Sequence, residues 1–237
     1  MSLRENLSMV RQLVPLAGIC AGYHMVKLVG NTIDAEDGFI EHRVSQLLAQ
    51  RLLRHLDLSV EVRGADKVAG LHRYCVACSH ASYLDWAVLL AYYPSPLRFV
   101  AKKELTRVPV IGDYLKLRGV LIDRRTGQTA KEAIAAAAYD GQPWPILIFP
   151  EGTRSPDGEI QPFKPGGLRL LAEAGRELVP ACVAGTYAAF PRQARVIRTG
   201  VPLRLTIGEP VRPADFATAD EAVAEVERRV RALRGAG

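Results

Sequence analysis

Short apolar runs of strand length recur along this chain, and segments with a helical pattern separate them. The runs cover residues 58–62, 74–78, 97–105, 119–124, 145–149, 178–183 and 201–208. Apolar runs of this length are typical of buried strands, and their alternation with helices is typical of a sheet that helices cover on both faces. The sequence therefore predicts an α/β fold in which a sheet is flanked by helices.

The helical patterns fit between these runs. They cover residues 38–56, 82–93, 129–139, 167–177 and the chain from about residue 220 onward. Pro109 and Gly112 predict only a short connection between two strands. With 237 residues, 49% of them hydrophobic, the chain can bury the core of one domain, or of one domain with a short appendage.

The net charge of the chain indicates what kind of molecule or surface it binds. The formal net charge is +6, which indicates a polyanionic partner or an anionic surface. The lysines and arginines are scattered, aromatic residues make up only 7%, and no basic-aromatic platform is present in the sequence. This pattern argues against nucleic acid and favours an anionic lipid surface.

Two N-terminal stretches bear on contact with a membrane. Residues 13–29 are apolar, but they include a proline, a histidine and a lysine and fall short of the roughly 20 residues that span a bilayer. We expect neither a spanning helix nor a cleavable signal there. Residues 38–56 predict an amphipathic helix whose polar face includes His42, Arg43 and Arg51. That helix can lie on anionic lipid or pack on its own domain, and the pattern leaves both open.

The four cysteines favour a structural role over a metal site. Cys75 and Cys78 have a metal-ligand spacing, but no second pair accompanies them and both lie within an apolar strand pattern. Cys20 and Cys182 complete no disulfide framework. The cysteines therefore fit a reduced, cytoplasm-facing setting, with no bound metal expected.

The run at residues 74–78 ends in the feature that most strongly indicates chemistry, His80 followed by Asp85. Five residues on one helix would turn the two side chains about 500° apart, so they can meet only across a turn. A strand, a corner at His80 and a helix that begins near Ser82 provide that turn. An imidazole held by a carboxylate has a fixed tautomer and can act as a general base. The alternative is a capping box, Ser82-x-x-Asp85, which only closes the start of the helix.

Charged residues follow three further apolar runs. Lys102 and Lys103, Arg124 and Arg125, and Glu151 with Arg154 all come at or just after a predicted strand. Functional groups of α/β sheets collect where strands end, so we expect these side chains to gather around His80. One base with several cations is a pattern suited to a hydroxyl substrate that also carries a phosphate group.

Ordered motifs in these segments resemble those of a known enzyme family. Residues 79–85 (Ser-His-Ala-Ser-Tyr-Leu-Asp) resemble the His-x4-Asp motif of the 1-acyl-sn-glycerol-3-phosphate (lysophosphatidic acid) acyltransferase family of glycerolipid acyltransferases. Residues 119–124, 149–155 and 178–183 resemble its second, third and fourth blocks, and residues 101–105 and 163–166 match in kind and order. The family commonly has Asn where this chain has Ser79. The resemblance covers about residues 62–185.

The resemblance implies a role for each candidate site residue. His80 would take the proton from the acceptor hydroxyl as that oxygen attacks an acyl thioester, and Asp85 would orient the imidazole. The remaining candidates would bind substrate. Among them, Arg124 and Arg154, with Lys102, would hold the acceptor phosphate, whereas Glu151, Gly152 and Thr153 would shape the glycerol and thioester site.

The resemblance also implies the cellular setting and the partners. The expected fold is a mixed, largely parallel sheet, with residues 1–57 as a helical, membrane-associating segment and residues 58–237 as the catalytic domain. The acceptor would be a lysophospholipid and the donor an acyl-CoA or an acyl-carrier protein, with no bound cofactor. The protein would be peripheral on the cytoplasmic face of the cell membrane. The alternatives are another acceptor such as a lyso-ornithine lipid, a thioesterase, and a non-catalytic membrane-binding module.

Overall fold

The computed structural model describes residues 39–108, 111–123 and 129–235, and the strands of this part form one seven-stranded sheet. The strands are β1 (Val60–Arg63), β2 (Cys75–Cys78), β3 (Arg98–Lys102), β4 (Val120–Ile122), β5 (Ile146–Ile148), β6 (Leu178–Ala184) and β7 (Leu203–Ile207). Their order across the sheet is β1-β7-β6-β2-β5-β3-β4. The five strands from β6 to β4 are parallel, β7 joins β6 in antiparallel pairing, and β1 is parallel to β7. The mixed, largely parallel sheet is confirmed.

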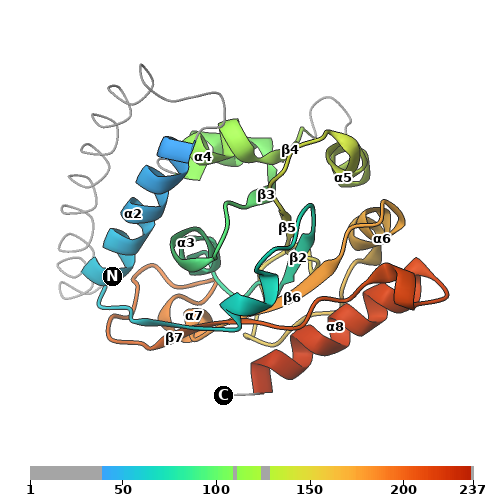
Figure 1. Ribbon diagram of the computed structural model, residues 1–237. Helices are drawn as coiled ribbons and strands as arrows, with labels where there is room; N and C mark the ends of the chain where they lie inside the picture. The colour runs from blue at the N-terminus through green and yellow to red at the C-terminus, as the bar shows by residue number, and fades with distance from the viewer. Residues whose placement is uncertain (1–38, 109–110, 124–128, 236–237) are drawn as a thin grey trace.

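Helices cover both faces of this sheet (Figure 1). The α-helices are α2 (Phe39–His55), α3 (Leu84–Tyr92), α4 (Ile111–Arg118), α5 (Ala130–Tyr139), α6 (Pro165–Glu173), α7 (Thr186–Ala189) and α8 (Ala219–Gly235), and the 3-10 turns are η1 (Ala65–Val68), η2 (Lys103–Arg107) and η4 (Pro213–Asp215). Residues of α2, α3 and α4 share one apolar core with the sheet, and residues of α5, α6 and α8 share a second core on its other face.

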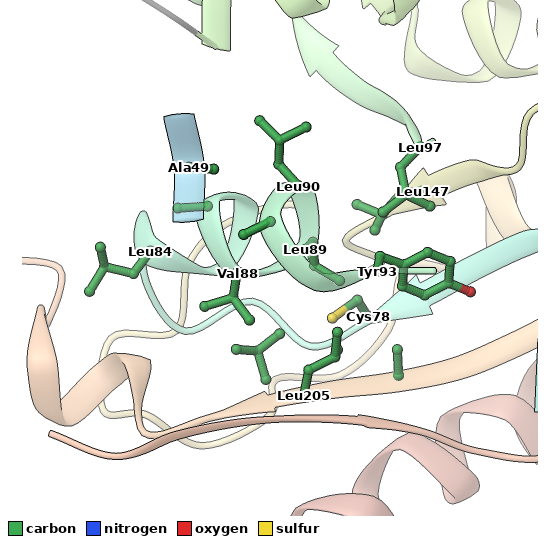
Figure 2. Close-up of a cluster of buried hydrophobic side chains, with 14 of the residues drawn as sticks. Ala49, Cys78, Leu84, Val88, Leu89, Leu90, Tyr93, Leu97, Leu147 and Leu205 are labelled. Atoms are coloured by element: carbon green, nitrogen blue, oxygen red, sulfur yellow. The ribbon is translucent and has the colours of Figure 1, made fainter. Parts of the chain in front are cut away.

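Strand β2 contributes to both cores because successive side chains of a strand point to opposite faces. Val76 and Cys78 lie in the core beneath α3, where Figure 2 labels Cys78, whereas Cys75 lies in the core beneath α5 and α6. Burial raises the pKa of both cysteine thiols. The two cysteines of the Cys-x-x-Cys pair therefore face opposite sides of the sheet and act as small apolar core residues.

Helix α2 packs on the rest of the domain through its apolar side. Leu53 is fully buried, and the Gln50 side chain donates a hydrogen bond from Nε2 to the Ala91 carbonyl of α3 at 2.9 Å. Its exposed side carries Arg51 and the 53% exposed Leu47. The buried apolar residues of α2 are therefore explained by packing of the helix on its own domain. Within the described ranges, no helix combines the length and the hydropathy needed to cross a bilayer.

His42 departs from the expected pattern of α2. The helical pattern assigns it to the polar face, but its side chain is buried and lies against the rings of Tyr114 and Trp144. Burial, together with the charges of Arg43 and Arg118, lowers its pKa to about 4. An aromatic surface provided by α4 and by the segment before β5 therefore replaces the solvent that the sequence pattern predicts.

The connection after β3 is also longer and more ordered than expected. In place of a short link, η2 and the two-turn helix α4 connect β3 to β4. Gly112 lies within α4, where a Cβ atom would be only 2.4 Å from the carbonyl oxygen of Thr106. The glycine is therefore needed for close packing of the helix start, and the prediction of only a short connection was wrong.

Candidate active site

The candidate site lies where the parallel strands β2, β5 and β6 end. His80 follows β2, Glu151 and Arg154 follow β5, and Thr186 opens α7 directly after β6. Because these strands are adjacent and parallel, their carboxyl ends bring the three loops to one edge of the sheet. Of the charged strand ends that were expected around His80, the structure brings the one after β5 to it.

His80 and Asp85 meet across the turn between β2 and α3. The Nδ1 atom of His80 is 2.8 Å from Oδ2 of Asp85. With Nδ1 donating to the carboxylate, Nε2 carries the free lone pair. The ring of Phe149 stacks on the imidazole, with centroids 4.0 Å apart and 18° between the planes. The imidazole is thus fixed at one edge and on one face, and its side chain remains 17% exposed.

Asp85 is fully buried, and four donors hold its carboxylate. Besides the imidazole, the backbone N–H groups of Ala81 and Ser82 donate to Oδ2 at 2.8 and 2.9 Å. The hydroxyl of Thr186 donates to Oδ1 at 2.5 Å. Asp85 therefore closes the turn before α3 and orients His80 at the same time, so the capping and catalytic interpretations describe one carboxylate. These hydrogen bonds offset the cost of burying a carboxylate away from water.

Glu151 supports the main chain of His80. One of its carboxylate oxygens accepts the backbone N–H of His80 at 2.6 Å, and the other accepts the backbone N–H of Gln161 at 2.9 Å. The backbone N–H of Ser155 donates to the His80 carbonyl at 2.8 Å. Glu151 is only 3% exposed, and burial raises its pKa. This geometry favours positioning of His80 over the direct substrate contact that the family resemblance implied.

Arg154 is placed as an unpaired cation near the base. Its guanidinium lies 3.3 Å above the ring of Tyr83, and its Nη1 atom is buried without a hydrogen-bond partner among the described residues. Burial and the nearby charge of Arg192 lower the pKa of Arg154. A guanidinium that is held flat on an aromatic ring, with an unused donor and no ion pair to any described residue, is suited to an oxyanion ligand.

The other sequence-predicted binding residues lie in different surroundings. Gly152 and Thr153 are exposed in the loop after β5, and a Cβ on Gly152, whose φ is +71°, would be 2.9 Å from Nζ of Lys164. Lys102 is exposed at the end of β3, two strands from β2, and in the described part of the chain its side chain has no hydrogen-bonding or ionic partner. Arg124 lies outside the described residues.

Four residues of the site were not singled out from the sequence. Phe149 and Tyr83 lie within the motif blocks. The motifs therefore identified the right segments, but they did not predict that Phe149 stacks on His80 or that Arg154 lies on Tyr83. Thr186 and Arg192 come from the segment after β6. Their contact with the site depends on the hydrogen bond, 2.7 Å long, from the Ser82 hydroxyl to the Phe190 carbonyl and on the Asp85 bond to Thr186. Such long-range pairing leaves no local signal.

Comparisons with known proteins agree with this geometry. A protein-family model described as "Acyltransferase" matches residues 59–184, more than half of the chain. Similar proteins include a 1-acyl-sn-glycerol-3-phosphate acyltransferase of Cocos nucifera, 30% identical over 59% of this chain and 46% of its own length. The protein of the same name from Helicobacter pylori is 40% identical over 41% of this chain and 42% of its own. The chain thus spans about half the length of several of these relatives.

Two further proteins match over a larger share of the chain. The human 1-acyl-sn-glycerol-3-phosphate acyltransferase alpha is 30% identical over 72% of this chain and 61% of its own length. The crystal structure of the 1-acyl-sn-glycerophosphate (LPA) acyltransferase PlsC from Thermotoga maritima superimposes with a TM-score of 0.81, covering 97% of this chain and 94% of that one at 24% identity. That likeness establishes the fold, and the family model establishes the family. This chain belongs to the acyltransferase family.

Proposed function

We propose that this protein transfers a fatty acyl group from an acyl thioester to the free hydroxyl of 1-acylglycerol 3-phosphate, which gives phosphatidic acid. The observation that carries the proposal is the His80–Asp85 pair, 2.8 Å apart, at the same sheet edge as the unpaired guanidinium of Arg154. The names of the similar proteins support the same acceptor. A base next to a free cation is what a substrate with one hydroxyl and one phosphate requires.

In the proposed reaction, Nε2 of His80 accepts the proton of the acceptor hydroxyl as its oxygen attacks the thioester carbonyl. Asp85 stabilises the imidazolium that forms, and the buried donors around the carboxylate hold it in place. The tetrahedral intermediate collapses, the carbon–sulfur bond breaks, and the imidazolium returns its proton to the leaving thiolate. The hydroxyl itself is the nucleophile, so this reaction requires no acyl-enzyme.

The acceptor phosphate would bind to Arg154, with Arg192 as a second cation. Arg192 is exposed, follows α7, and lies close enough for its charge to act on Arg154. Two guanidiniums that repel each other gain from a dianionic ligand between them. Arg124, which lies outside the described residues, stays a proposed third contact, and Lys102 at the end of β3 stays a weaker candidate.

The lipid substrates imply where the protein works. A lysophospholipid resides in a bilayer, so we expect peripheral binding at the cytoplasmic face of the membrane, through residues 1–57. Of these, residues 1–38 lie outside the described part, and α2 supports the proposal with its exposed Arg43, Arg51 and Leu47. The acyl donor is either acyl-CoA or acyl-carrier protein, and no further cofactor takes part in the proposed reaction.

Thiol release tests this proposal. Purified protein is given a long-chain acyl-CoA, or the acyl-carrier protein thioester, with and without lysophosphatidic acid in mixed micelles, and the lipid products are measured by mass. The proposal predicts release that depends on the acceptor and equals the amount of phosphatidic acid formed. Release without acceptor, together with free fatty acid, would identify a thioesterase. Turnover only with another lysolipid would reassign the acceptor, and no turnover with any lysolipid would favour a membrane-binding module.

A further inference from the structure

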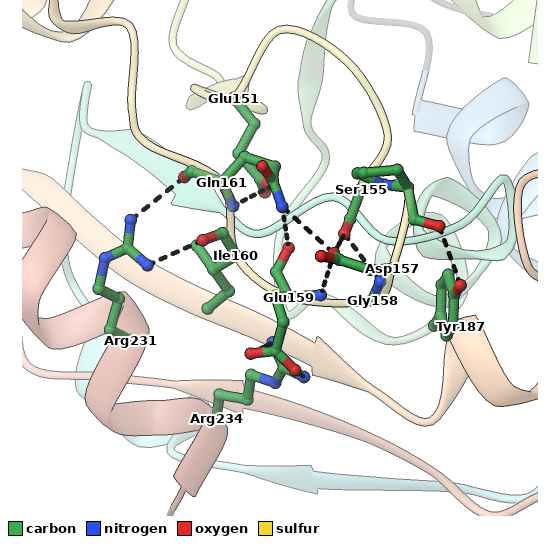
Figure 3. Close-up of polar contacts among 11 residues, drawn as sticks. Glu151, Ser155, Asp157, Gly158, Glu159, Ile160, Gln161, Tyr187, Arg231 and Arg234 are labelled. Atoms are coloured by element: carbon green, nitrogen blue, oxygen red, sulfur yellow. Dashed lines mark hydrogen bonds and ion pairs between the residues drawn. The ribbon is translucent and has the colours of Figure 1, made fainter.

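The C-terminal helix α8 contacts a peptide group that also hydrogen-bonds to Glu151 of the candidate active site. Figure 3 shows two arginines of α8 that hold the loop between β5 and α6 in different ways. Arg234 forms an ion pair with the Glu159 side chain, with 2.6 and 2.9 Å between the paired atoms. Arg231 instead donates to the main chain, to the Ile160 carbonyl at 2.8 Å and the Gln161 carbonyl at 3.3 Å. The two arginines are therefore similar in position and different in what they contact.

The Ile160 carbonyl belongs to the same peptide group as the N–H of Gln161. That N–H donates to the carboxylate of Glu151 at 2.9 Å. The peptide thus lies between a cation at its oxygen and an anion at its hydrogen, and each hydrogen bond polarises the peptide in the sense that strengthens the other. Glu227, one turn earlier on α8, accepts from the Arg231 guanidinium at 2.6 Å and orients it.

The other end of this chain of contacts is the base. Glu151 accepts the backbone N–H of His80 at 2.6 Å, so a loss of negative charge on Glu151 would weaken the hold on the main chain that carries the imidazole. The titratable groups around Glu151 are the His80 ring, Asp85 at the start of α3 and the Cys78 thiol of β2. Burial, as the largest influence, raises the pKa of Glu151, and the N–H donors from Gln161 and His80 oppose it.

We propose that Arg231 is a positioning residue, which holds Glu151 and, through it, the backbone of His80 by polarising the peptide between Ile160 and Gln161. Removal of the cation leaves the peptide N–H a poorer donor to the carboxylate, so Glu151 binds a proton at higher pH. The consequence for catalysis rests on the proposed function, whereas the effect on Glu151 does not depend on any turnover.

The experiment is an NMR pH titration of the backbone amides in protein labelled with ¹⁵N-histidine, of which the chain has five. The signal of the His80 amide is expected to shift when Glu151 binds a proton. Glu151→Gln cannot bind that proton, so the transition that is missing in this variant is the one caused by Glu151. Arg231→Met is expected to raise the midpoint of this transition by about half a pH unit, a small change because the arginine side chain is 42% exposed. Arg234→Met, which also removes a charge from α8, is the matched control and is expected to leave the midpoint in place.

The kinetics give the second readout. Below the midpoint, Arg231→Met should have about threefold lower kcat, with the acceptor KM unchanged, and should recover at higher pH; Arg234→Met should show no such pH dependence. If Arg231→Met does not fold, Arg231→Gln, which keeps a donor without the charge, should show the same upward shift. Equal midpoints in the Arg231 and Arg234 variants would overturn the inference. Wild-type protein that titrates as expected but transfers no acyl group would overturn the proposed function alone.

Discussion

Arginines gather at both edges of the sheet, but their surroundings differ. At the amino edge, where the parallel strands begin, Arg98 forms a bidentate pair with Asp140, one bond of which is 3.0 Å. Arg176 there donates to the carbonyls that end α5, at Ala137 and Ala138, with one nitrogen left unpaired. At the carboxyl edge, within the described part of the chain, Arg154 has an aromatic ring beneath it and forms no ion pair.

This difference indicates how the two edges are used. A guanidinium that is paired with an acid, as in Arg98, or with the carbonyl end of a helix, as in Arg176, has its partners within the fold and stabilises it. An unpaired one keeps its charge for a ligand. Changes at the carboxyl edge should therefore alter turnover with little effect on stability, and changes at the amino edge should do the reverse.

The largest expected effect comes from the base at the carboxyl edge. His80→Ala should lower kcat at least about 10³-fold, because general base catalysis and the orientation that depends on it are both lost. The free energy of unfolding should change by less than about 1 kcal/mol, since the imidazole is partly exposed and its removal leaves the other three donors to Asp85 in place. Acyl-transfer rates and urea unfolding of the same preparation check both statements; an active variant would remove His80 from the mechanism.

The amino edge should show the opposite behaviour. Arg98→Ala removes a buried side chain and its bidentate contact with the partly exposed Asp140 carboxylate, and it should lower the free energy of unfolding by about 2 kcal/mol. The kcat per folded molecule should stay at the wild-type value, because Arg98 lies at the other end of β3 from the site. Urea titrations, and assays corrected for the folded fraction, measure the two quantities. A fall in kcat without a loss of stability would remove the distinction between the edges.

An intermediate effect on kcat is expected at Thr186, which comes from a segment far from Asp85 in the sequence and hydrogen-bonds to it at the carboxyl edge. Thr186→Val keeps the shape of the buried side chain but removes its hydrogen bond to Asp85, and it should lower kcat about tenfold with the acceptor KM unchanged. Thr186→Ser keeps the hydroxyl and should recover most of the rate. Steady-state kinetics of both variants make the test, and a valine variant with the wild-type kcat would show that the hydroxyl is not needed.

The smallest effect is expected at the ring beneath Arg154. Tyr83→Ala removes the surface that holds the guanidinium flat and should raise the acceptor KM about threefold to fivefold, with kcat nearly unchanged. Tyr83→Phe keeps the ring and serves as the control. A kcat defect shared by both variants would instead place the tyrosine hydroxyl in the reaction.

The parts of this account that are local in sequence could be predicted from the sequence. The meeting of His80 and Asp85 follows from their spacing across a strand–helix turn, and the placement of Glu151 and Arg154 follows from the end of an apolar run. The fold class follows from the alternation of the elements.

The parts that depend on tertiary contacts could not be predicted in this way. The burial of His42 and the contact of Arg231 with the loop after β5 both come from packing between elements far apart in the chain. In the helical pattern, each of these residues lies on a polar face. The orientation of Glu151 toward the main chain of His80 likewise depends on the register of β2 and β5.

The most direct test of the unpaired arginine compares acceptors with and without a phosphate. The kcat/KM values for lysophosphatidic acid and for a monoacylglycerol of the same chain length are measured in wild type and in Arg154→Ala. The account predicts that the wild type prefers the phosphate-bearing acceptor and that the variant loses about 100-fold in kcat/KM on that acceptor alone, so that the preference disappears. An equal loss on both acceptors would show that Arg154 does not bind the phosphate and would contradict the proposed division between the two edges.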